Sequence, residues 1–219
     1  MSTKFDLIPI VGVSAAITLI CIVVLTRLAE KIDLLDYPND RKHHGEPTPL
    51  VGGLAIYCVS MFGLVIFDAP TTMIWFIMSA TILVFVGVLD DAFDLAVLPR
   101  IATQILTSLL LILGAEIWIS DFGFLKLEGG LVFQTASILI TVLAVVGLMN
   151  SFNMIDGLDG LSTGHALITL TCVITVLVLS PKPVLDGDWL AVMFTAIGIV
   201  FVVNLSLVPI KRIFLGDAG

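Results

Sequence analysis

Seven apolar stretches of about 20 residues each follow one another along this chain, and they constrain its fold more than any other feature. They are Leu7–Leu25, Leu50–Phe67, Thr71–Leu89, Ile101–Ile119, Leu131–Met149, Leu161–Leu179 and Trp189–Val208. In the hydrocarbon core of a bilayer, unpaired backbone N–H and C=O groups are so costly that each stretch must form a helix. The sequence therefore predicts an all-α fold: a polytopic membrane helix bundle of about seven transmembrane helices, as a single transmembrane domain over residues 1–219.

The composition agrees with a membrane protein and argues against a nucleic-acid-binding protein. Hydrophobic residues make up 58% of the chain and charged residues only 13%, against about 25% charged residues in a soluble domain. The formal net charge of −8 argues against nucleic-acid binding, because that function requires clustered Lys and Arg side chains. We expect a membrane environment and no nucleic-acid partner.

Seven spans place the connecting segments alternately on the two sides of the membrane. One side receives residues 29–49, 90–100, 150–160 and 209–219. That side holds or borders most of the basic residues: Arg27, Lys31, Arg41, Lys42, Arg100, Lys211 and Arg212. The other side holds only Lys4, Lys126 and Lys182. The positive-inside rule therefore predicts that the first side is cytoplasmic and that the amino terminus lies outside.

Acidic residues mark the second cytoplasmic segment, where Asp90, Asp91 and Asp94 follow an apolar stretch directly. Three neighbouring carboxylates repel one another, and a divalent cation such as Mg²⁺ would offset that repulsion. On a continuing helix Asp90 and Asp94 share a face, whereas Asp91 points about 100° away. The pattern favours a metal or phosphate site, and the alternative is a solvated acidic helix end.

The third segment carries an oxygen-bearing side chain at every third position: Asn150, Asn153, Asp156 and Asp159. Glycines interrupt this series, so the segment does not suit a lipid-facing helix. The spacing predicts a polar pocket at a helix terminus. The alternative is a capped turn held by local side-chain hydrogen bonds.

The first cytoplasmic segment, residues 29–49, and the last one, residues 209–219 (the tail), add further groups. Lys42 and His44 precede the Gly52-Gly53 pair, and basic side chains beside exposed backbone N–H groups suit an anion such as phosphate. The alternative is an ordinary basic loop with turn residues. In the tail, Asp217 stands between Gly216 and Ala218, where it could reach a metal ion or a phosphate.

Taken together, the four segments suit a magnesium-bound diphosphate at the cytoplasmic face, with a second substrate delivered from the bilayer as a lipid. The rival class is an ion-coupled transporter or channel. Its acidic residues should lie in the middle of the spans, whereas the acids here gather at one boundary.

Five motifs, in this order, resemble the polyprenyl-phosphate N-acetylhexosamine-1-phosphate transferase family (glycosyltransferase family 4). They are Asp36-Tyr37-Pro38-Asn39 with Arg41-Lys42-x-His44; Pro49-Leu50-Val51-Gly52-Gly53; Asp90-Asp91-x-x-Asp94-Leu95; Asn150-x-x-Asn153-x-x-Asp156-Gly157-Leu158-Asp159-Gly160-Leu161; and Phe214-Leu215-Gly216-Asp217-Ala218-Gly219. Because the family continues past the last motif with further spans, the resemblance implies that this chain is the amino-terminal portion of a larger fold.

The resemblance also implies a reaction. It is closest to the branch that transfers GlcNAc-1-phosphate from UDP-GlcNAc to undecaprenyl phosphate and releases UMP, at the start of O-antigen and enterobacterial common antigen synthesis. The phospho-MurNAc-pentapeptide transferase branch is the alternative. The implied location is the bacterial inner membrane, with a cytoplasmic active site and a periplasmic amino terminus, and a homodimer is compatible with it.

Residue roles follow from the resemblance in the same way. Mg²⁺, with Mn²⁺ as the alternative, is expected on Asp217 and Asn153, with Asp91 as a third ligand. Asp90 is expected to position or deprotonate the attacking phosphate, and Arg100 to hold the lipid phosphate. Asp156 and Asp159 would shape the nucleotide-sugar side, and the remaining pocket residues would be Lys42, His44, Gly52, Gly53 and Asn150. A covalent aspartyl-phosphate on Asp90, Asp91 or Asp156 stays open as a second mechanism.

Overall fold

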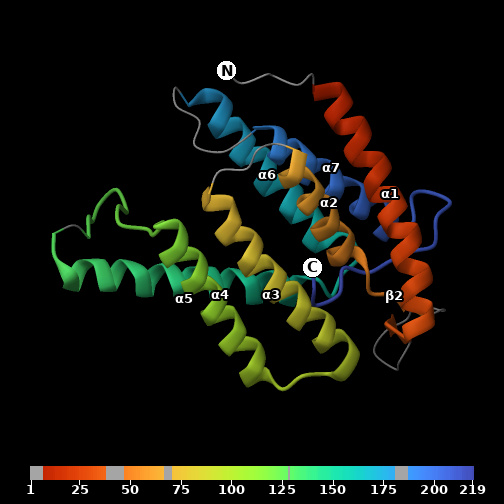
Figure 1. The fold of residues 1–219 in the computed structure, drawn as a ribbon, viewed down its shortest axis with the longest axis horizontal. Coiled ribbons are helices and arrows are strands. Elements are labelled where there is room, and N and C mark those ends of the chain that lie inside the picture. Colours follow the sequence, from red (N-terminus) through yellow and green to blue (C-terminus); the bar gives the residue numbers. More distant parts are fainter. Residues whose placement is uncertain (1–6, 38–46, 67–70, 128, 181–186) are drawn as a thin grey trace.

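The structure, a computed structural model, describes residues 7–37, 47–66, 71–127, 129–180 and 187–219, and it is a bundle of helices (Figure 1). The elements are α1 (Leu7–Ile32), β1 (Leu35–Asp36), β2 (Thr48–Pro49), α2 (Gly52–Ile66), α3 (Thr71–Phe93), α4 (Val97–Ala115), α5 (Leu131–Ile155), α6 (Leu161–Leu179) and α7 (Gly187–Asn204). Apart from the two-residue antiparallel strands, the regular structure of the described residues is helical, which confirms the all-α membrane class.

Six of these helices are long and apolar enough to cross a membrane, and α2, with 15 residues, is shorter. Since a span needs about 20 residues, the prediction of seven spans is met by six full-length helices and one short apolar helix.

The centre of the bundle is α7, which packs against α1, α2 and α6. Of its span, 44% is buried inside the protein, against 11–22% in the other five long helices. The facing side of α1 carries small polar residues at helical spacing: Ser14, Thr18 and Thr26 are buried beside Ile10 and Ile22. Small side chains let membrane helices approach closely, and this explains how α1 and α7 fit together.

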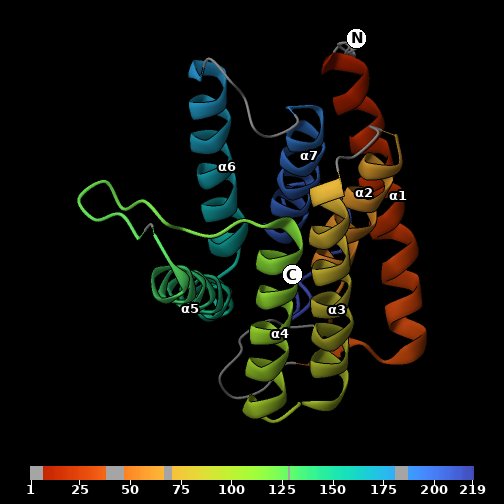
Figure 2. The same ribbon diagram turned by 60° about the vertical axis from the view of Figure 1, so that its left-hand side comes forward.

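Helix α5 lies across the direction of its neighbours. Figure 2 shows it almost end-on, while α3, α4, α6 and α7 run along the vertical. It packs mainly on α4, and its only buried side chains are Ser137, Thr141 and Val142. The last turns of α5 thereby reach the ends of α3 and α4, where the polar residues gather.

Three helix boundaries differ from the predicted ones and change the setting of the site. Helix α3 continues through Asp90 and Asp91 to Phe93, and Asp94 then adopts a left-handed conformation with φ 50°. The predicted span ended at Leu89, so the helix is longer than expected but does not continue through Asp94. Helix α4 begins at Val97, before Pro99, because proline is tolerated in a first helical turn. The predicted polar loop at 150–160 is helical as far as Ile155.

The carboxyl-terminal segment after α7 is part of the core. Ile213 and Leu215 are buried in one apolar cluster with Ile22, Val51 and Val200. The backbone of Phe214 also pairs with the chain at Leu50: its N–H donates to the carbonyl of Pro49 at 2.9 Å. Burial and hydrogen bonding on both sides fix this segment, so the position of Asp217 is set by the fold.

Candidate functional site

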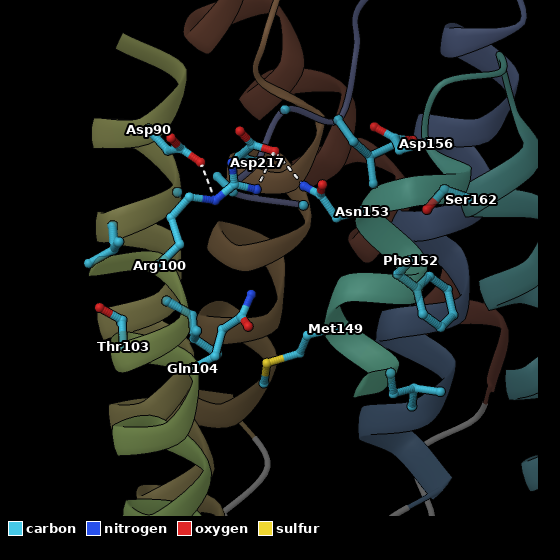
Figure 3. Close-up of a pocket in the computed structure, with 18 of the residues that line it drawn as sticks. Asp90, Arg100, Thr103, Gln104, Met149, Phe152, Asn153, Asp156, Ser162 and Asp217 are labelled. Atoms are coloured by element: carbon cyan, nitrogen blue, oxygen red, sulfur yellow. Dashed lines mark hydrogen bonds and ion pairs between the residues drawn. The ribbon is translucent and has the colours of Figure 1, made fainter. Parts of the chain in front are cut away.

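The polar residues of the predicted segments meet around one cavity of about 380 Å³, which lies between α3, α4, α5 and the tail (Figure 3). A cavity of this size is typical of a small-molecule site. Its polar end is lined by Asp90, Arg100, Asn153, Asp156 and Asp217. The wall away from this end is apolar and includes Leu83, Val86, Val145, Leu148 and Met149. The cavity can therefore hold a charged group at one end and an apolar chain along its wall.

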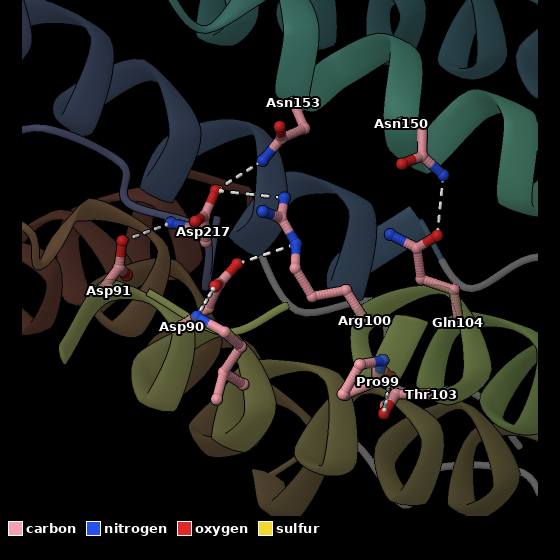
Figure 4. A network of polar contacts seen from close by, with 10 residues as sticks. Asp90, Asp91, Pro99, Arg100, Thr103, Gln104, Asn150, Asn153 and Asp217 are labelled. Carbon is pink, nitrogen blue, oxygen red and sulfur yellow. Dashed lines mark hydrogen bonds and ion pairs between the residues drawn. The ribbon is translucent and has the colours of Figure 1, made fainter. Parts of the chain in front are cut away.

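Arg100 connects the acidic residues of the polar end (Figure 4). Its Nε lies 2.8 Å from Oδ2 of Asp90, and its Nη2 lies 3.9 Å from Oδ1 of Asp217. The Asp90 side chain is only 3% exposed, and its other oxygen accepts the N–H of Leu95 at 2.9 Å. A buried carboxylate needs such partners, so Asp90 and Arg100 form a charge-paired unit in which Nε of the arginine binds Asp90 and its Nη2 is directed toward Asp217.

Asp217 sits where three elements converge. Its Oδ1 accepts a hydrogen bond from Nδ2 of Asn153 at 2.5 Å, and its backbone N–H donates to Oδ1 of Asp91 at 2.9 Å. The backbone approaches α3 closely: a Cβ on Gly87 would lie 2.5 Å from the carbonyl oxygen of Asp217. Only a glycine fits there, which places Asp217 directly against the helix that carries Asp90.

Asp91 lies behind the tail and does not line the cavity. One of its oxygens holds the turn at Asp217, and the other, Oδ2, is buried with no hydrogen-bond partner among the described residues. Gly216 packs on this carboxylate with φ 74°, a left-handed conformation that favours glycine. Asp90 and Asp91 therefore differ in setting, as the helical rotation between neighbouring residues predicts.

The glycine pair does not present free N–H groups to an anion. The N–H of Gly52 donates to the carbonyl of Phe214 at 2.8 Å, and that of Gly53 donates to the carbonyl of Leu215 at 2.9 Å. Both glycines are buried, and a Cβ on Gly53 would lie 2.2 Å from the backbone nitrogen of Gly219. The N–H groups of the glycine pair therefore bind the backbone of the tail, which carries Asp217, instead of the expected phosphate.

The two acids of the third segment have different surroundings. Asp156 follows the last turn of α5 and lines the cavity. Burial, and then the negative charges of Asp217 and Asp159, raise the pKa of the Asp156 carboxyl to about 6. Asp159 instead forms an ion pair with Arg212, is half exposed and does not line the cavity.

Asn150 also differs from its expected place. Its Nδ2 donates to Oε1 of Gln104 at 2.7 Å and to the carbonyl of Val146 at 2.8 Å, so it ties α5 to α4 beside the cavity (Figure 4). Lys42 and His44 lie outside the described residues.

Two amide residues that the sequence reading did not single out belong to this region. Gln104 lines the cavity. Asn204 is buried: its Oδ1 accepts the N–H of Gly160 at 2.6 Å, and its Nδ2 donates to the carbonyl of Ile213 at 2.8 Å. Asn204 thereby joins the turn after α5 to the tail. A signal existed for both, because a polar side chain inside an apolar membrane stretch marks a functional or structural contact.

The donor atoms at the polar end suit a hard cation. Within the described ranges no group of three or more His, Cys, Asp or Glu side chains is arranged to hold a metal ion. Mg²⁺ in proteins, however, usually takes only one or two carboxylates, with water and substrate phosphates as its other ligands. Asp217 and the amide of Asn153 provide oxygen atoms of that kind, whereas the Oδ2 of Asp91 packs against Gly216, outside the cavity lining.

Comparison with known proteins points to one family. Residues 73–219 match the model for glycosyl transferase family 4. The chain is 32% identical over 197 residues to the undecaprenyl-phosphate alpha-N-acetylglucosaminyl 1-phosphate transferase of Escherichia coli K12, covering 88% of this chain and 53% of the relative. The protein of the same name from Salmonella typhi is 33% identical over 205 residues, covering 92% of this chain and 55% of the relative.

A protein from Mycobacterium leprae is a further relative. The decaprenyl-phosphate N-acetylglucosaminephosphotransferase of Mycobacterium leprae is 31% identical over 229 residues, covering 96% of this chain and 57% of that protein. The chain thus spans about half the length of the relatives it matches. The matched region contains the Asp90–Asp91 pair, the Asn153–Asp156 segment and Asp217, and the chain belongs to glycosyl transferase family 4.

Proposed function

We propose that the complete protein transfers GlcNAc-1-phosphate from UDP-GlcNAc to undecaprenyl phosphate and releases UMP. The observation that carries the proposal is the cavity itself, in which Arg100 and carboxylates meet at the end of an apolar wall. A lipid phosphate requires both features at once, because its head group is an anion and its chain is hydrocarbon. The names of the relatives, which carry both N-acetylglucosamine and a polyprenyl phosphate, support this choice of donor and acceptor.

In this reaction an oxygen of the lipid phosphate forms a bond to the β-phosphorus of UDP-GlcNAc. The bond from that phosphorus to the bridging oxygen breaks, and the electron pair leaves with UMP. The lipid phosphate is already ionised near neutral pH, since a phosphate monoester has its second pKa near 6. The protein therefore contributes mainly alignment and charge stabilisation, as in other phosphoryl transfers.

Arg100 is suited to align the acceptor. Asp90 holds it through Nε, so the remaining guanidinium N–H groups keep a fixed direction toward the cavity and can bind two phosphate oxygens. Asp90 is therefore a positioning residue that orients Arg100. Asp156, at the same polar end and directly after α5, is placed to contact the nucleotide sugar.

Mg²⁺, or Mn²⁺ in its place, would be held by Asp217 and Asn153, and Asp91, which was expected as a third ligand, would support Asp217 by accepting its backbone N–H. The cation would offset the negative charge of the diphosphate and of the leaving UMP. Asp217 also keeps Asn153 in place through the hydrogen bond between their side chains.

The location is part of the proposal. We place the protein in a bacterial inner membrane, with the cavity at the cytoplasmic face and the amino terminus in the periplasm. Support comes from the distribution of basic residues, because seven of the ten Lys and Arg residues lie in or beside the segments on the side of the membrane where the polar end of the cavity lies.

The test uses the complete protein in detergent or proteoliposomes with undecaprenyl phosphate. Mg²⁺-dependent release of UMP from UDP-GlcNAc, together with formation of undecaprenyl-pyrophosphate-GlcNAc, is the expected result. UDP-MurNAc-pentapeptide serves as the competing donor, and preference for it would assign the protein to the peptidoglycan branch. Release of UMP from neither donor would refute the proposal.

A further inference from the structure

We propose that Gln104 is a substrate-binding residue whose side-chain NH₂ group donates hydrogen bonds to the phosphate of the lipid acceptor, beside Arg100. This inference rests on the proposed function, and it adds a residue to which no role has been given so far. Its basis is the hydrogen-bond geometry between α4 and α5.

The orientation of the Gln104 amide follows from its neighbours. The atom of Asn150 that faces the carbonyl of Val146, at 2.8 Å, must be the nitrogen, because a backbone carbonyl only accepts. The same nitrogen lies 2.7 Å from the Gln104 side chain, so the Gln104 atom there must be the acceptor, Oε1. The NH₂ group of Gln104 is therefore the end of the amide that does not bind Asn150. Exchanging it with the oxygen would break the hydrogen bond from Asn150.

That NH₂ group is available to a ligand. Gln104 lines the cavity and is only partly exposed. Within the part of the chain that the structure describes, the hydrogen bonds of this side chain consist of the one from Asn150. Figure 4 shows the nitrogen turned away from Asn150, on the side where Arg100 lies. A donor fixed in this way before the ligand arrives loses little freedom on binding.

The position of Gln104 favours the lipid phosphate over the nucleotide sugar. Residues four apart on a helix share a face, so Gln104 and Arg100 lie on one side of α4 and can bind the same phosphate group. Asn153 and Asp217 lie at the polar end, whereas Gln104 is beside Met149 and the apolar wall (Figure 3). An anion bound by Arg100 and Gln104 would have its hydrocarbon chain directed along that wall.

The variant Gln104→Glu separates this role from a structural one. Glutamate still accepts the hydrogen bond from Asn150, so the contact between α4 and α5 is kept. It replaces the NH₂ donor with an anionic oxygen that repels a phosphate. Gln104→Met removes both the oxygen acceptor and the NH₂ donor, so it reports the effect of losing the hydrogen bond from Asn150 as well. Gln134→Glu is the matched control, since Gln134 is exposed in the first turn of α5, at the opposite end of that helix from Asn150.

Initial rates are measured with the complete protein while undecaprenyl phosphate and UDP-GlcNAc are varied in turn. Because hydrogen bonds to a charged group are strong, we expect Gln104→Glu to raise the KM for undecaprenyl phosphate about 10-fold or more. The KM for UDP-GlcNAc should change less than about twofold, and Gln134→Glu should resemble the wild type.

Two results would overturn the inference while leaving the proposed function intact: an unchanged KM for undecaprenyl phosphate in Gln104→Glu, or a rise confined to UDP-GlcNAc. Binding supplies a readout independent of turnover, because undecaprenyl phosphate should raise the melting temperature of the wild type and of Gln134→Glu but not of Gln104→Glu. An equal rise in all three proteins also contradicts the assignment. Absence of transfer by the wild type, by contrast, would count against the proposed function.

Discussion

Nε of Arg100 lies 2.8 Å from Oδ2 of Asp90, and this contact joins the first turn of α4 to the last turn of α3 across a three-residue connection. The pair is asymmetric: the side chain of Asp90 is 3% exposed and that of Arg100 is 29% exposed. The acid is therefore the buried partner, and the arginine depends on it for its direction while still reaching the cavity. Several expected outcomes depend on this arrangement.

Replacing Arg100 by Met leaves Asp90 buried without a counter-charge. Removing one partner of a buried pair costs about 3–5 kcal/mol, and the exposure of Arg100 reduces this to about 1–3 kcal/mol. We expect a clear fall in the melting temperature of the complete protein in detergent. The double variant Asp90→Asn/Arg100→Met should recover part of that loss. Additive losses in the double variant would contradict a direct pairing of the two side chains.

Arg100→Lys tests the alignment of the acceptor. Lysine keeps the positive charge but lacks the planar set of donors that can hold Asp90 and a phosphate together. We expect the KM for undecaprenyl phosphate to rise by about 10-fold, with the KM for UDP-GlcNAc nearly unchanged. The measurement is UMP release at varied concentrations of each substrate. Wild-type kinetics in the lysine variant would show that charge alone suffices at this position.

Asp217→Asn should abolish Mg²⁺-dependent transfer, with a loss of about 100-fold or more if the carboxylate holds the cation that stabilises the diphosphate. The backbone N–H that donates to Asp91 is unchanged by this substitution, so the protein should still fold. Its amount in the membrane and its melting temperature should stay near those of the wild type. A variant that keeps the wild-type rate at all Mg²⁺ concentrations would remove Asp217 from the metal site.

The stability of the protein should depend on pH through Asp156. Its pKa is raised to about 6 in the folded protein, against about 3.9 for an unperturbed Asp. Protonation therefore favours the folded state, and the stabilisation, complete below about pH 4, is lost as pH rises through about 6. Asp156→Asn should melt at a higher temperature than the wild type at pH 8, and the difference should vanish near pH 4.

This measurement is made in EDTA, so that no divalent cation contributes to the charge of the site. Asp94→Asn removes the same charge from an exposed position outside the cavity and controls for the change in net charge. A difference between the Asp156 variant and the wild type that persists unchanged at pH 4 would contradict the pH dependence argued here.

The glycines beside the tail predict a graded series of alanine variants. A Cβ would lie 2.2 Å from the backbone of Gly219 in Gly53→Ala and 3.0 Å from the backbone of Leu215 in Gly52→Ala, and it would meet nothing within 4 Å in Gly198→Ala. We expect transfer to fall most in Gly53→Ala and less in Gly52→Ala. Gly198→Ala should retain wild-type activity, and its helix propensity should rise. Equal activity in all three would show that the seating of the tail does not matter for catalysis.

Much of this arrangement was accessible from the sequence. The lengths of the apolar stretches predicted the membrane helices, because backbone groups in lipid leave no alternative to helix. Counting these stretches also predicted that Asp90, Asn153, Asp156 and Asp217 would come together, and the structure places all four around one cavity. The residues of α2 were recognised as apolar, although the helix proved shorter than a full span.

Other features depended on contacts between segments far apart in the chain. The sequence suggested an anion site at Gly52 and Gly53, but their N–H groups are taken by the tail, about 160 residues later. The separation of Asp90 from Asp91, the pairing of Asp159 with Arg212, and the bond from Asn150 to Gln104 likewise follow from how the helices pack.

The sequence by itself thus determined the class of the protein, the number of apolar stretches and the membrane boundary at which its acids gather, because these follow from hydrophobic length and chain order. Only the tertiary structure decided which acid faces the cavity, which glycines serve the fold and which end of the Gln104 amide is turned away from Asn150. The physical reason is that a polar group in a membrane protein must find a partner, and the identity of that partner depends on packing between segments that the linear pattern does not specify.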